Sequence, residues 1–152
     1  MTTEKLSAKE VETIGLLAEW YQREWDIKPE ITTSRLNSHP GADILIQLLL
    51  RIDGVPACTG GIYNEVGLLK VYPDYRKYGP WVAQVYTVPA YRQKGLGSML
   101  LTELEKWSKQ QNFKELYLYT NTAESLYVRN GWRTFDKVIY REKETALMRK
   151  LL

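Results

Sequence analysis

The segment at residues 85–98, VYTVPAYRQKGLGS, constrains the fold of this chain more than any other. It continues an almost uniformly apolar run, residues 81–88, which is typical of a strand buried on both faces of a sheet. Pro89 ends that run, since proline has no N–H to donate to a sheet ladder. Gly95 and Gly97 then precede an apolar stripe at helical spacing. The segment therefore predicts an interior strand, a glycine-containing turn and a helix that ends near residue 111.

Three other segments carry helical signals. Apolar residues recur at helical spacing over residues 8–25, behind the capping-box pattern Ser7-x-x-Glu10. A short second helix is expected within residues 32–41. Residues 123–130 predict another short helix, which an Asn-Gly pair closes.

The remaining apolar runs predict strands. Residues 44–52 form a continuous apolar run, and the Asp-Gly pair after them is a hairpin signal before a partner strand at residues 55–63. A second turn leads into residues 68–72, which gives three or four antiparallel strands before the interior strand. Later strands are expected at residues 116–120, 132–140 and 145–151. This order predicts the α+β class, with one mixed, mostly antiparallel sheet flanked by helices.

Composition and charge exclude several classes of function. The chain has 152 residues without a linker or repeat, so one domain over residues 1–152 is expected. The net charge of +3, without a polybasic block, argues against a nucleic-acid partner. A single cysteine, Cys58, and a single histidine, His39, exclude an intrachain disulfide and make a zinc site implausible, so no metal is expected. No apolar run is long enough to span a bilayer and no signal core is apparent, so no membrane partner and a cytoplasmic location are expected.

The turn at residues 92–98 has the chemistry of a phosphate-binding site. The first turn of a helix carries unsatisfied N–H groups and the positive end of the helix dipole. Glycines let an anion approach the backbone closely, and Arg92 and Lys94 add positive charge. The Gly-Lys-Ser/Thr ending of a Walker motif is absent, as is the third glycine of a dinucleotide fingerprint. The turn therefore suits a diphosphate that belongs to neither of those ligand classes.

Two motifs in this order resemble one family. Arg92-Gln93-Lys94-Gly95-Leu96-Gly97 is similar to the Arg/Gln-x-x-Gly-x-Gly/Ala motif of the GNAT superfamily of N-acetyltransferases. About 30 residues later, Ala-x-x-Leu-Tyr-x-x-Asn-Gly-Trp at residues 123–132 resembles the family's Ala-x-x-Leu-Tyr-x-x-x-Gly-Phe element. The resemblance extends over residues 43–149, so the chain is identified as a member of this superfamily, with its splayed fourth and fifth strands.

The resemblance implies acetyl-coenzyme A as co-substrate. In the family, backbone amides of the glycine-rich loop hold the diphosphate, and the pantetheine arm pairs with the fourth strand. The family's asparagine before the short helix is replaced by Thr120, with Asn121 one residue later, and either could bind pantetheine. The implied coenzyme-binding residues are Val85, Tyr86, Thr87, Arg92, Gln93, Lys94, Gly95, Leu96, Gly97, Ser98 and Asn121.

The resemblance also implies a catalytic acid. Tyr127 matches the tyrosine that protonates the departing thiolate in many members, although a packed helix tyrosine is the alternative. The general base stays open. Gln84 stands near the family's strand glutamate and cannot take a proton, and Glu65, Glu24 and Asp43 are the other candidates. No base is needed if the acceptor amine arrives neutral.

Taken together, the motifs imply an N-acetyltransferase in which a primary amine attacks the thioester directly. Amides near residues 85–87 would polarise the carbonyl. The alternative is a non-catalytic acyl-coenzyme A-binding sensor or interaction module. A small-molecule or a protein amine could be the acceptor, in a pocket built from residues 20–37, 72–81 and 137–144. Monomer and homodimer both remain open.

Overall fold

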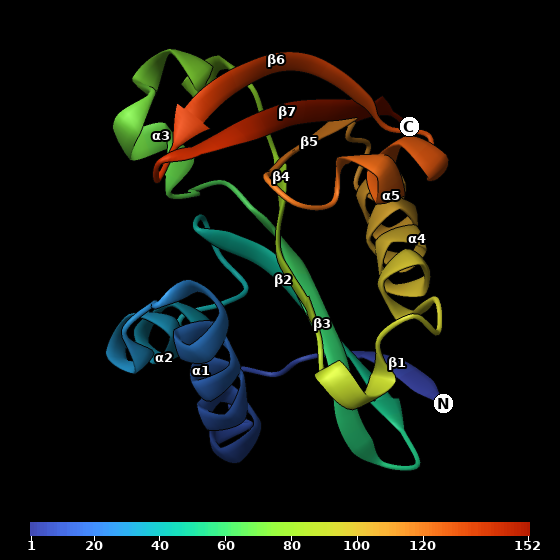
Figure 1. Ribbon diagram of the computed structural model, residues 1–152. Coiled ribbons are helices and arrows are strands. Elements are labelled where there is room, and N and C mark those ends of the chain that lie inside the picture. The colour runs from blue at the N-terminus through green and yellow to red at the C-terminus, as the bar shows by residue number, and fades with distance from the viewer.

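A computed structural model describes residues 1–152, which form one seven-stranded sheet with helices on both faces (Figure 1). The strand order is β1-β2-β3-β4-β5-β7-β6. Every neighbouring pair is antiparallel except β4 and β5, which are parallel. The predicted α+β class with a mixed, mostly antiparallel sheet is confirmed. The strands are β1 (Thr2–Lys5), β2 (Ile44–Ile52), β3 (Val55–Tyr63), β4 (Trp81–Thr87), β5 (Glu115–Thr120), β6 (Arg133–Tyr140) and β7 (Lys143–Leu151).

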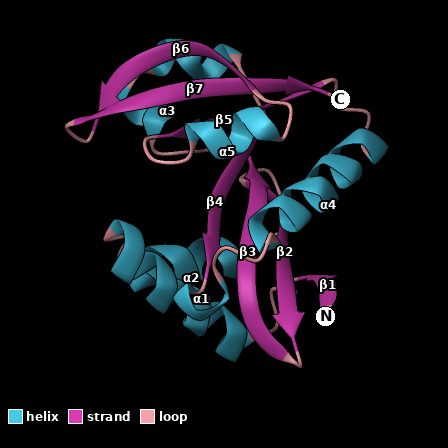
Figure 2. Cartoon of the chain, turned by 45° about the vertical axis from the view of Figure 1, so that its right-hand side comes forward, coloured by secondary structure: helices cyan, strands magenta, loops and turns pink.

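The long helices cover opposite sides of the central strands (Figure 2). Two helices near the N-terminus lie against one side of β2–β4, and the helix after the glycine turn lies against the other. Two 3-10 turns, η1 (Pro73–Lys77) and η2 (Pro89–Tyr91), flank β4. The helices are α1 (Val11–Trp25), α2 (Pro29–Asn37), α3 (Leu68–Val71), α4 (Leu96–Gln110) and α5 (Glu124–Arg129).

The sheet separates two apolar cores of similar size. Successive side chains of a strand point to opposite faces, so β2 supplies both cores. Leu49 packs with Leu17 of α1 in one core, while Leu50 packs with Leu100 of α4 in the other. All four of these leucines are fully buried. Burial of each such side chain stabilises the fold by about 1.5–3 kcal/mol, which holds α1 and α4 on their respective faces.

Strands β4 and β5 meet only where they begin. Trp81 and Tyr117 are their one register pair, and the Tyr117 N–H donates to the Pro80 carbonyl at 3.1 Å. Beyond Trp81, β4 continues to pair with β3 as far as Thr87. The edge of β4 that faces β5 is therefore unpaired over its second half, and the predicted splay of the fourth and fifth strands is confirmed.

The N-terminal segment differs from the sequence expectation. Thr2–Lys5 forms the edge strand β1, where a polar sequence predicts no strand, because its main chain pairs with β2. Helix α1 begins at Val11, later than expected. The Ser7 N–H donates to the Glu10 carboxylate at 2.7 Å, and the Ser7 hydroxyl accepts from the Lys9 N–H at 3.2 Å. The capping-box residues thus close a turn ahead of the helix.

Two further elements are shifted relative to the prediction. Residues 68–72, expected as a further antiparallel strand after the second turn, form the short helix α3 over Leu68–Val71 instead. Their Leu68 and Leu69 side chains are buried in the same core as those of α1, which also includes Leu147 of β7. Helix α2 starts at Pro29, earlier than expected, since proline suits the first position of a helix.

Candidate functional site

Strand β4 carries a β-bulge at Gln84. The register with β3 shifts between Thr59 and Gly61, so that Gln84 and Val85 together stand opposite Gly60. Gln84 has a φ of +55°, which residues other than glycine rarely adopt. A Cβ on Gly60 would lie 2.9 Å from a Leu100 methyl and 3.0 Å from a Val85 methyl, so the close packing opposite the bulge favours glycine. Bulges re-aim side chains and bend strands, and this one lies where β4 separates from β5.

Buried polar side chains hold this bulge from the α1 side. The Tyr21 hydroxyl donates to the Gln84 main-chain carbonyl at 2.9 Å. The Gln47 side-chain nitrogen donates to the Tyr21 hydroxyl at 3.1 Å and to the Thr59 hydroxyl at 2.8 Å. The Tyr63 hydroxyl lies 2.8 Å from the Gln47 amide oxygen and 3.1 Å from the Gln84 side-chain amide. These contacts join α1, β2, β3 and β4 through one network.

The network is almost completely removed from solvent. Tyr21, Gln47 and Thr59 are each 0 % exposed, and burial raises the pKa of both Tyr21 and Tyr63. Sequence reasoning did not find these residues as functional. The one signal was Gln47, a lone amide inside the apolar run of β2.

The turn between η2 and α4 presents a row of free main-chain donors. None of the six N–H groups of residues 93–98 donates to an acceptor within the protein, whereas the Met99 N–H donates to the Gly95 carbonyl at 3.1 Å. Gly95 precedes α4 with a φ of +78°, and no side chain caps the helix. A Cβ on Gly97 would meet nothing within 4 Å. The predicted coenzyme turn is therefore open to a ligand at its donors.

The two cations of this turn face different groups. The Arg92 side chain is directed back toward β4, where its Nε donates to the Thr87 carbonyl at 2.9 Å and its guanidinium lies 5.5 Å from the Tyr86 ring centroid. Its main-chain N–H donates to the Pro89 carbonyl, at 3.3 Å. Lys94 is exposed. The side chain of Arg92 therefore supports the end of β4, and Lys94 supplies the freer charge beside the turn.

Tyr127 lies on α5 against the same core as β4. Its ring is 6.1 Å from the Trp132 ring in an edge-on arrangement, and it packs with Val85 against the core cluster that contains Cys58. No protein group hydrogen-bonds to its hydroxyl. Burial, with a smaller contribution from Cys58, raises the pKa of Tyr127 to about 12. The phenol is thus protonated and free to donate.

A contact joins α5 to the glycine turn. The Asn130 side-chain nitrogen, at the end of α5, lies 3.3 Å from the Ser98 hydroxyl and donates to the Leu126 carbonyl at 2.8 Å. The structure thus brings together Val85, the turn and Tyr127 from three separate elements.

Asn121 lies in a different environment. It lines a polar pocket of about 350 Å³ with Lys137 and Glu144 of the β6–β7 hairpin. Thr120 beside it uses its hydroxyl to accept the Ala123 N–H at 3.0 Å, at the start of α5. No hydrogen bond joins Asn121 to the glycine turn.

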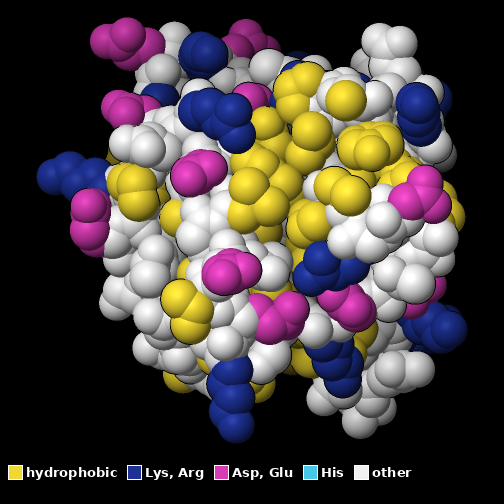
Figure 3. Space-filling model, turned by 90° about the horizontal axis from the view of Figure 1, so that it is seen from below, with side chains coloured by type: hydrophobic (Ala, Val, Ile, Leu, Met, Phe, Trp, Pro, Cys, Tyr) yellow, Lys and Arg dark blue, Asp and Glu magenta, His cyan; other side chains and the backbone are white.

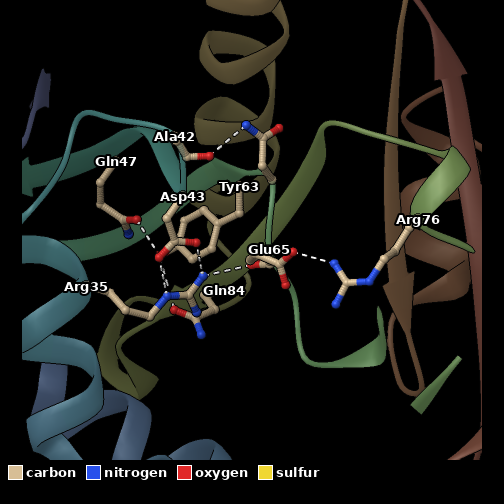
Figure 4. A network of polar contacts seen from close by, with 9 residues as sticks. Arg35, Ala42, Asp43, Gln47, Tyr63, Glu65, Arg76 and Gln84 are labelled. Atoms are coloured by element: carbon tan, nitrogen blue, oxygen red, sulfur yellow. Dashed lines mark hydrogen bonds and ion pairs between the residues drawn. The ribbon is translucent and has the colours of Figure 1, made fainter. Parts of the chain in front are cut away.

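Two of the carboxylates considered as bases, Asp43 and Glu65, are paired with arginines (Figure 4), and the third, Glu24, lies near one. Asp43 accepts two hydrogen bonds from Arg35, at 2.8 and 2.7 Å, and these bonds raise the pKa of the arginine. Glu65 pairs with Arg76, while its main-chain carbonyl accepts from Arg35 at 2.8 Å. Glu24 lies 3.9 Å from the turn arginine. None of the three carboxylates is left unpaired beside Gln84.

Six aromatic residues of segments 20–37, 72–81 and 137–144, where the acceptor pocket is expected, divide into three groups. Trp20 and Trp81 are 4 % and 0 % exposed and belong to the core. Tyr75 and Tyr78 pack against β6. Trp25 and Tyr140 are only half-buried, and these two remain available to a ligand.

The β6–β7 turn reaches across to the end of α1. Arg141 donates to the Trp25 carbonyl at 3.3 Å, and its guanidinium lies 5.5 Å from the Tyr140 ring. This contact joins the β6–β7 turn to the last residue of α1.

Charges of both signs are dispersed over the end of the molecule that carries η2 and the β2–β3 turn. Seen from that end, hydrophobic side chains form a continuous patch with acidic and basic groups scattered around it (Figure 3). No group of three or more His, Cys, Asp or Glu side chains could hold a metal ion. No helix is long and apolar enough to cross a membrane.

Comparison with solved structures shows a shared fold. An aminoglycoside 6'-N-acetyltransferase in complex with coenzyme A superposes with a TM-score of 0.77 at 12% identity, over 99% of this chain and 97% of that one. Ard1 from Thermoplasma volcanium gives 0.73 at 14% identity, with coverage of 99% and 97%. An acyl-CoA N-acyltransferase from Klebsiella pneumoniae gives 0.66 at 24% identity, again with 99% and 97%.

Sequence comparison gives the family directly. No curated protein sequence matches this chain significantly. The sequence model of the acetyltransferase (GNAT) family matches residues 12–132, which include β4, the glycine turn, α4 and α5. The chain therefore belongs to the acetyltransferase (GNAT) family, an acetyl-coenzyme A-dependent family of N-acetyltransferases.

Proposed function

We propose that residues 1–152 form a single catalytic domain that transfers the acetyl group of acetyl-coenzyme A to a primary amine. The observation that carries this proposal is the row of six N–H groups at residues 93–98, which have no acceptor in the protein and lie at the start of α4. A diphosphate supplies the acceptors that such a row needs. The acetyl thioester supplies an activated carbonyl and a thiolate leaving group.

The unpaired edge of β4 is the second part of the proposed coenzyme site. Val85, Tyr86 and Thr87 follow the bulge, on the half of β4 that β5 does not pair. An amide-containing arm can pair with such an edge as an added strand would. Main-chain N–H groups near this point would also polarise the acetyl carbonyl. Asn121 is proposed as a further contact of the same arm.

Tyr127 is proposed as the acid. Its hydroxyl has no partner in the protein, and its pKa of about 12 keeps it protonated at neutral pH. As the bond from carbon to nitrogen forms and the bond from carbon to sulfur breaks, Tyr127 gives its proton to sulfur. Water returns that proton, and the amine proton passes to solvent.

The acceptor amine is proposed to react in its neutral form. Asp43 and Glu65 are paired with Arg35 and Arg76, and Glu24 lies 3.9 Å from Arg92, so no free carboxylate is placed beside Gln84. Gln84, which forms the bulge, has no basic group. The pH dependence of the rate should then follow the pKa of the amine that is supplied.

The acceptor is proposed to enter between α1, α2 and the β6–β7 turn. Trp25 and Tyr140 offer half-buried aromatic faces there, which can contact an apolar or cationic amine. Nothing in this space selects a small-molecule amine over a protein amine, so both are included in the test.

Two measurements test the proposal. Calorimetry should detect coenzyme A binding, and the absence of heat at any concentration would end the account. Release of free thiol from acetyl-coenzyme A should depend on an amine in a panel of tyramine, spermidine, kanamycin, and peptides with a free N-terminus or a lysine. Binding without amine-dependent release would instead identify a non-catalytic coenzyme-binding module.

A further inference from the structure

We propose that Gln84 orients the acceptor amine by offering it the side-chain carbonyl oxygen, while its amide nitrogen donates to Tyr63. This inference rests on the proposed acetyl transfer, and it names the group that receives the nucleophile. It follows from counting the protons of the buried network that holds the bulge.

The two hydroxyl donors of Tyr21 and Thr59 each have their single proton bound to a main-chain carbonyl. The Tyr21 hydroxyl has one proton, which goes to the Gln84 main-chain carbonyl at 2.9 Å. The Thr59 hydroxyl gives its proton to the Leu48 carbonyl at 2.7 Å. Both hydroxyls must therefore accept from the Gln47 side-chain nitrogen, at 3.1 and 2.8 Å. The two amide protons of Gln47 are thus fully used.

The Gln47 amide oxygen can only accept, and its donor is the Tyr63 hydroxyl at 2.8 Å. Because Tyr63 has a single proton, it cannot also donate to the Gln84 side chain 3.1 Å away. That second contact becomes a hydrogen bond when Gln84 turns its nitrogen toward Tyr63. The two ends of an amide have nearly the same shape, and the hydrogen-bond network decides between them.

The opposite orientation of the Gln84 amide would leave a fully buried oxygen, that of Gln47, without a hydrogen-bond donor. If Tyr63 donated to Gln84, the Gln47 oxygen would be buried without a donor. Gln47 is 0 % exposed, whereas Gln84 is half-buried and can exchange partners with water or a ligand. A missing hydrogen bond costs most at the fully buried group. The network therefore favours Gln84 as donor to Tyr63.

In this orientation the Gln84 oxygen faces away from Tyr63. Gln84 lines a space of about 10 Å³ together with Thr32 and Arg35 of α2, and Figure 4 shows the Gln84 side chain near that of Arg35. An amide oxygen accepts an amine N–H without removing its proton, so the nitrogen lone pair stays available for attack. Tyr63 and Tyr21 then act as positioning residues, since they act through Gln84.

Kinetics of Gln84→Met and Gln84→Glu test the role. The assay uses the amine of the panel with the highest turnover, with coenzyme A affinity measured alongside. Gln84→Met should lower kcat/KM for the amine about tenfold or more, and coenzyme A affinity should stay within about twofold. Gln84→Glu should be impaired as well, since an ionised carboxylate cannot donate to Tyr63. Gln110→Met makes the same change at an exposed position, the last residue of α4, and is the matched control.

The outcomes separate the possibilities. A Gln84→Glu variant as active as wild type beside an impaired Gln84→Met variant would overturn the orientation. Wild-type kinetics in both variants would overturn the role of Gln84. Loss of coenzyme binding or of amine-dependent thiol release in the wild-type protein would instead reject the proposed function.

NMR of the wild-type protein tests the orientation without activity. The side-chain amide resonances of Gln84 are identified by their loss in Gln84→Met. Their protons should show close contacts to the Tyr63 ring and slow exchange with water. Contacts to Arg35 and Thr32 without any to Tyr63 would contradict the inference.

Discussion

The hydroxyl of Tyr21 on α1 donates a hydrogen bond of 2.9 Å to the main-chain carbonyl of Gln84 on β4, 63 residues away along the chain. A bulge leaves ladder groups unpaired, so this bond supplies a partner that the neighbouring strand does not. The helix that covers one face of the sheet thereby holds the strand conformation on which the proposed site depends.

Removal of that hydroxyl should weaken both stability and turnover. Tyr21→Phe leaves the Gln84 carbonyl and one Gln47 N–H without partners in the core, which costs about 1–3 kcal/mol for each buried group. Urea unfolding should show a lower midpoint, and kcat should fall because the bulge is no longer held. Tyr75→Phe, which loses a hydroxyl bonded to Asp136 on the protein surface, is the control. Equal midpoints for Tyr21→Phe and wild type would contradict the role given to this bond.

The two glycines of the turn should respond differently to substitution. Gly95 has a positive φ, so Gly95→Ala should destabilise the protein by about 1–2 kcal/mol. Gly97 is helical with open space around it, so Gly97→Ala should be neutral or stabilising by up to about 1 kcal/mol. Gly97→Leu should fold equally well and yet lose coenzyme A affinity, because its side chain would cover the free N–H groups. Thermal unfolding and calorimetry on the three variants measure these effects.

Tyr127→Phe should lower kcat by about a hundredfold, the lower end of the range for general acids, with coenzyme A affinity unchanged. Unchanged kcat would make Tyr127 a packing residue only. Affinity lost together with turnover would make it a binding residue.

The acid role has a pH signature. The pKa of Tyr127 is raised to about 12, above its unfolded value of about 10, so folding favours the neutral phenol. Its contribution to stability is complete below about pH 10 and is lost as the pH rises through about 12. The rate should therefore show no decline from this group between about pH 8 and 10. Spectroscopic titration of wild type against Tyr127→Phe gives the pKa directly, and a value near 10 would contradict the burial.

The side chains of Arg92 and Lys94 should differ in their effects on the coenzyme. Lys94→Gln should weaken binding by less than about 1 kcal/mol, with the difference shrinking at high salt, as for an exposed ion interaction. Arg92→Gln should change affinity less, because its side chain faces Thr87 and Tyr86. Calorimetry at low and high salt compares the two, and a larger loss with Arg92→Gln at low salt would show that its guanidinium reaches the phosphates.

The sequence predicted the strand–turn–helix around Gly95 because its signals are local. The effects of proline and glycine on the backbone, and the spacing of apolar residues, depend on only a few neighbouring residues. These signals predicted β4 and α4 at the positions where the structure has them. Strand β1 was missed because its polar residues carry no strand pattern, and main-chain pairing to β2 alone makes it a strand. Residues 68–71 were misassigned because so short a segment, with three apolar residues and Lys70, suits a helix as well as a strand.

The candidate site was predictable only where it depends on such local signals. The open turn could be inferred from two glycines before a helix. The network of Tyr21, Gln47, Tyr63 and Gln84 could not, because each of its bonds joins residues distant in sequence. The bulge at Gln84 arises because two residues of β4 pair opposite Gly60 of β3. The order of residues within β4 gives no signal that predicts it.

The central claim is that the free N–H groups of residues 93–98 bind the coenzyme diphosphate, and amide NMR tests it most directly. On addition of coenzyme A to nitrogen-15-labelled protein, the main-chain resonances of residues 93–98 should shift strongly, and their exchange with water should slow. Dephosphorylated pantetheine, which lacks the diphosphate, should leave them unchanged. Saturable binding of coenzyme A with no response from these six amides would contradict the account.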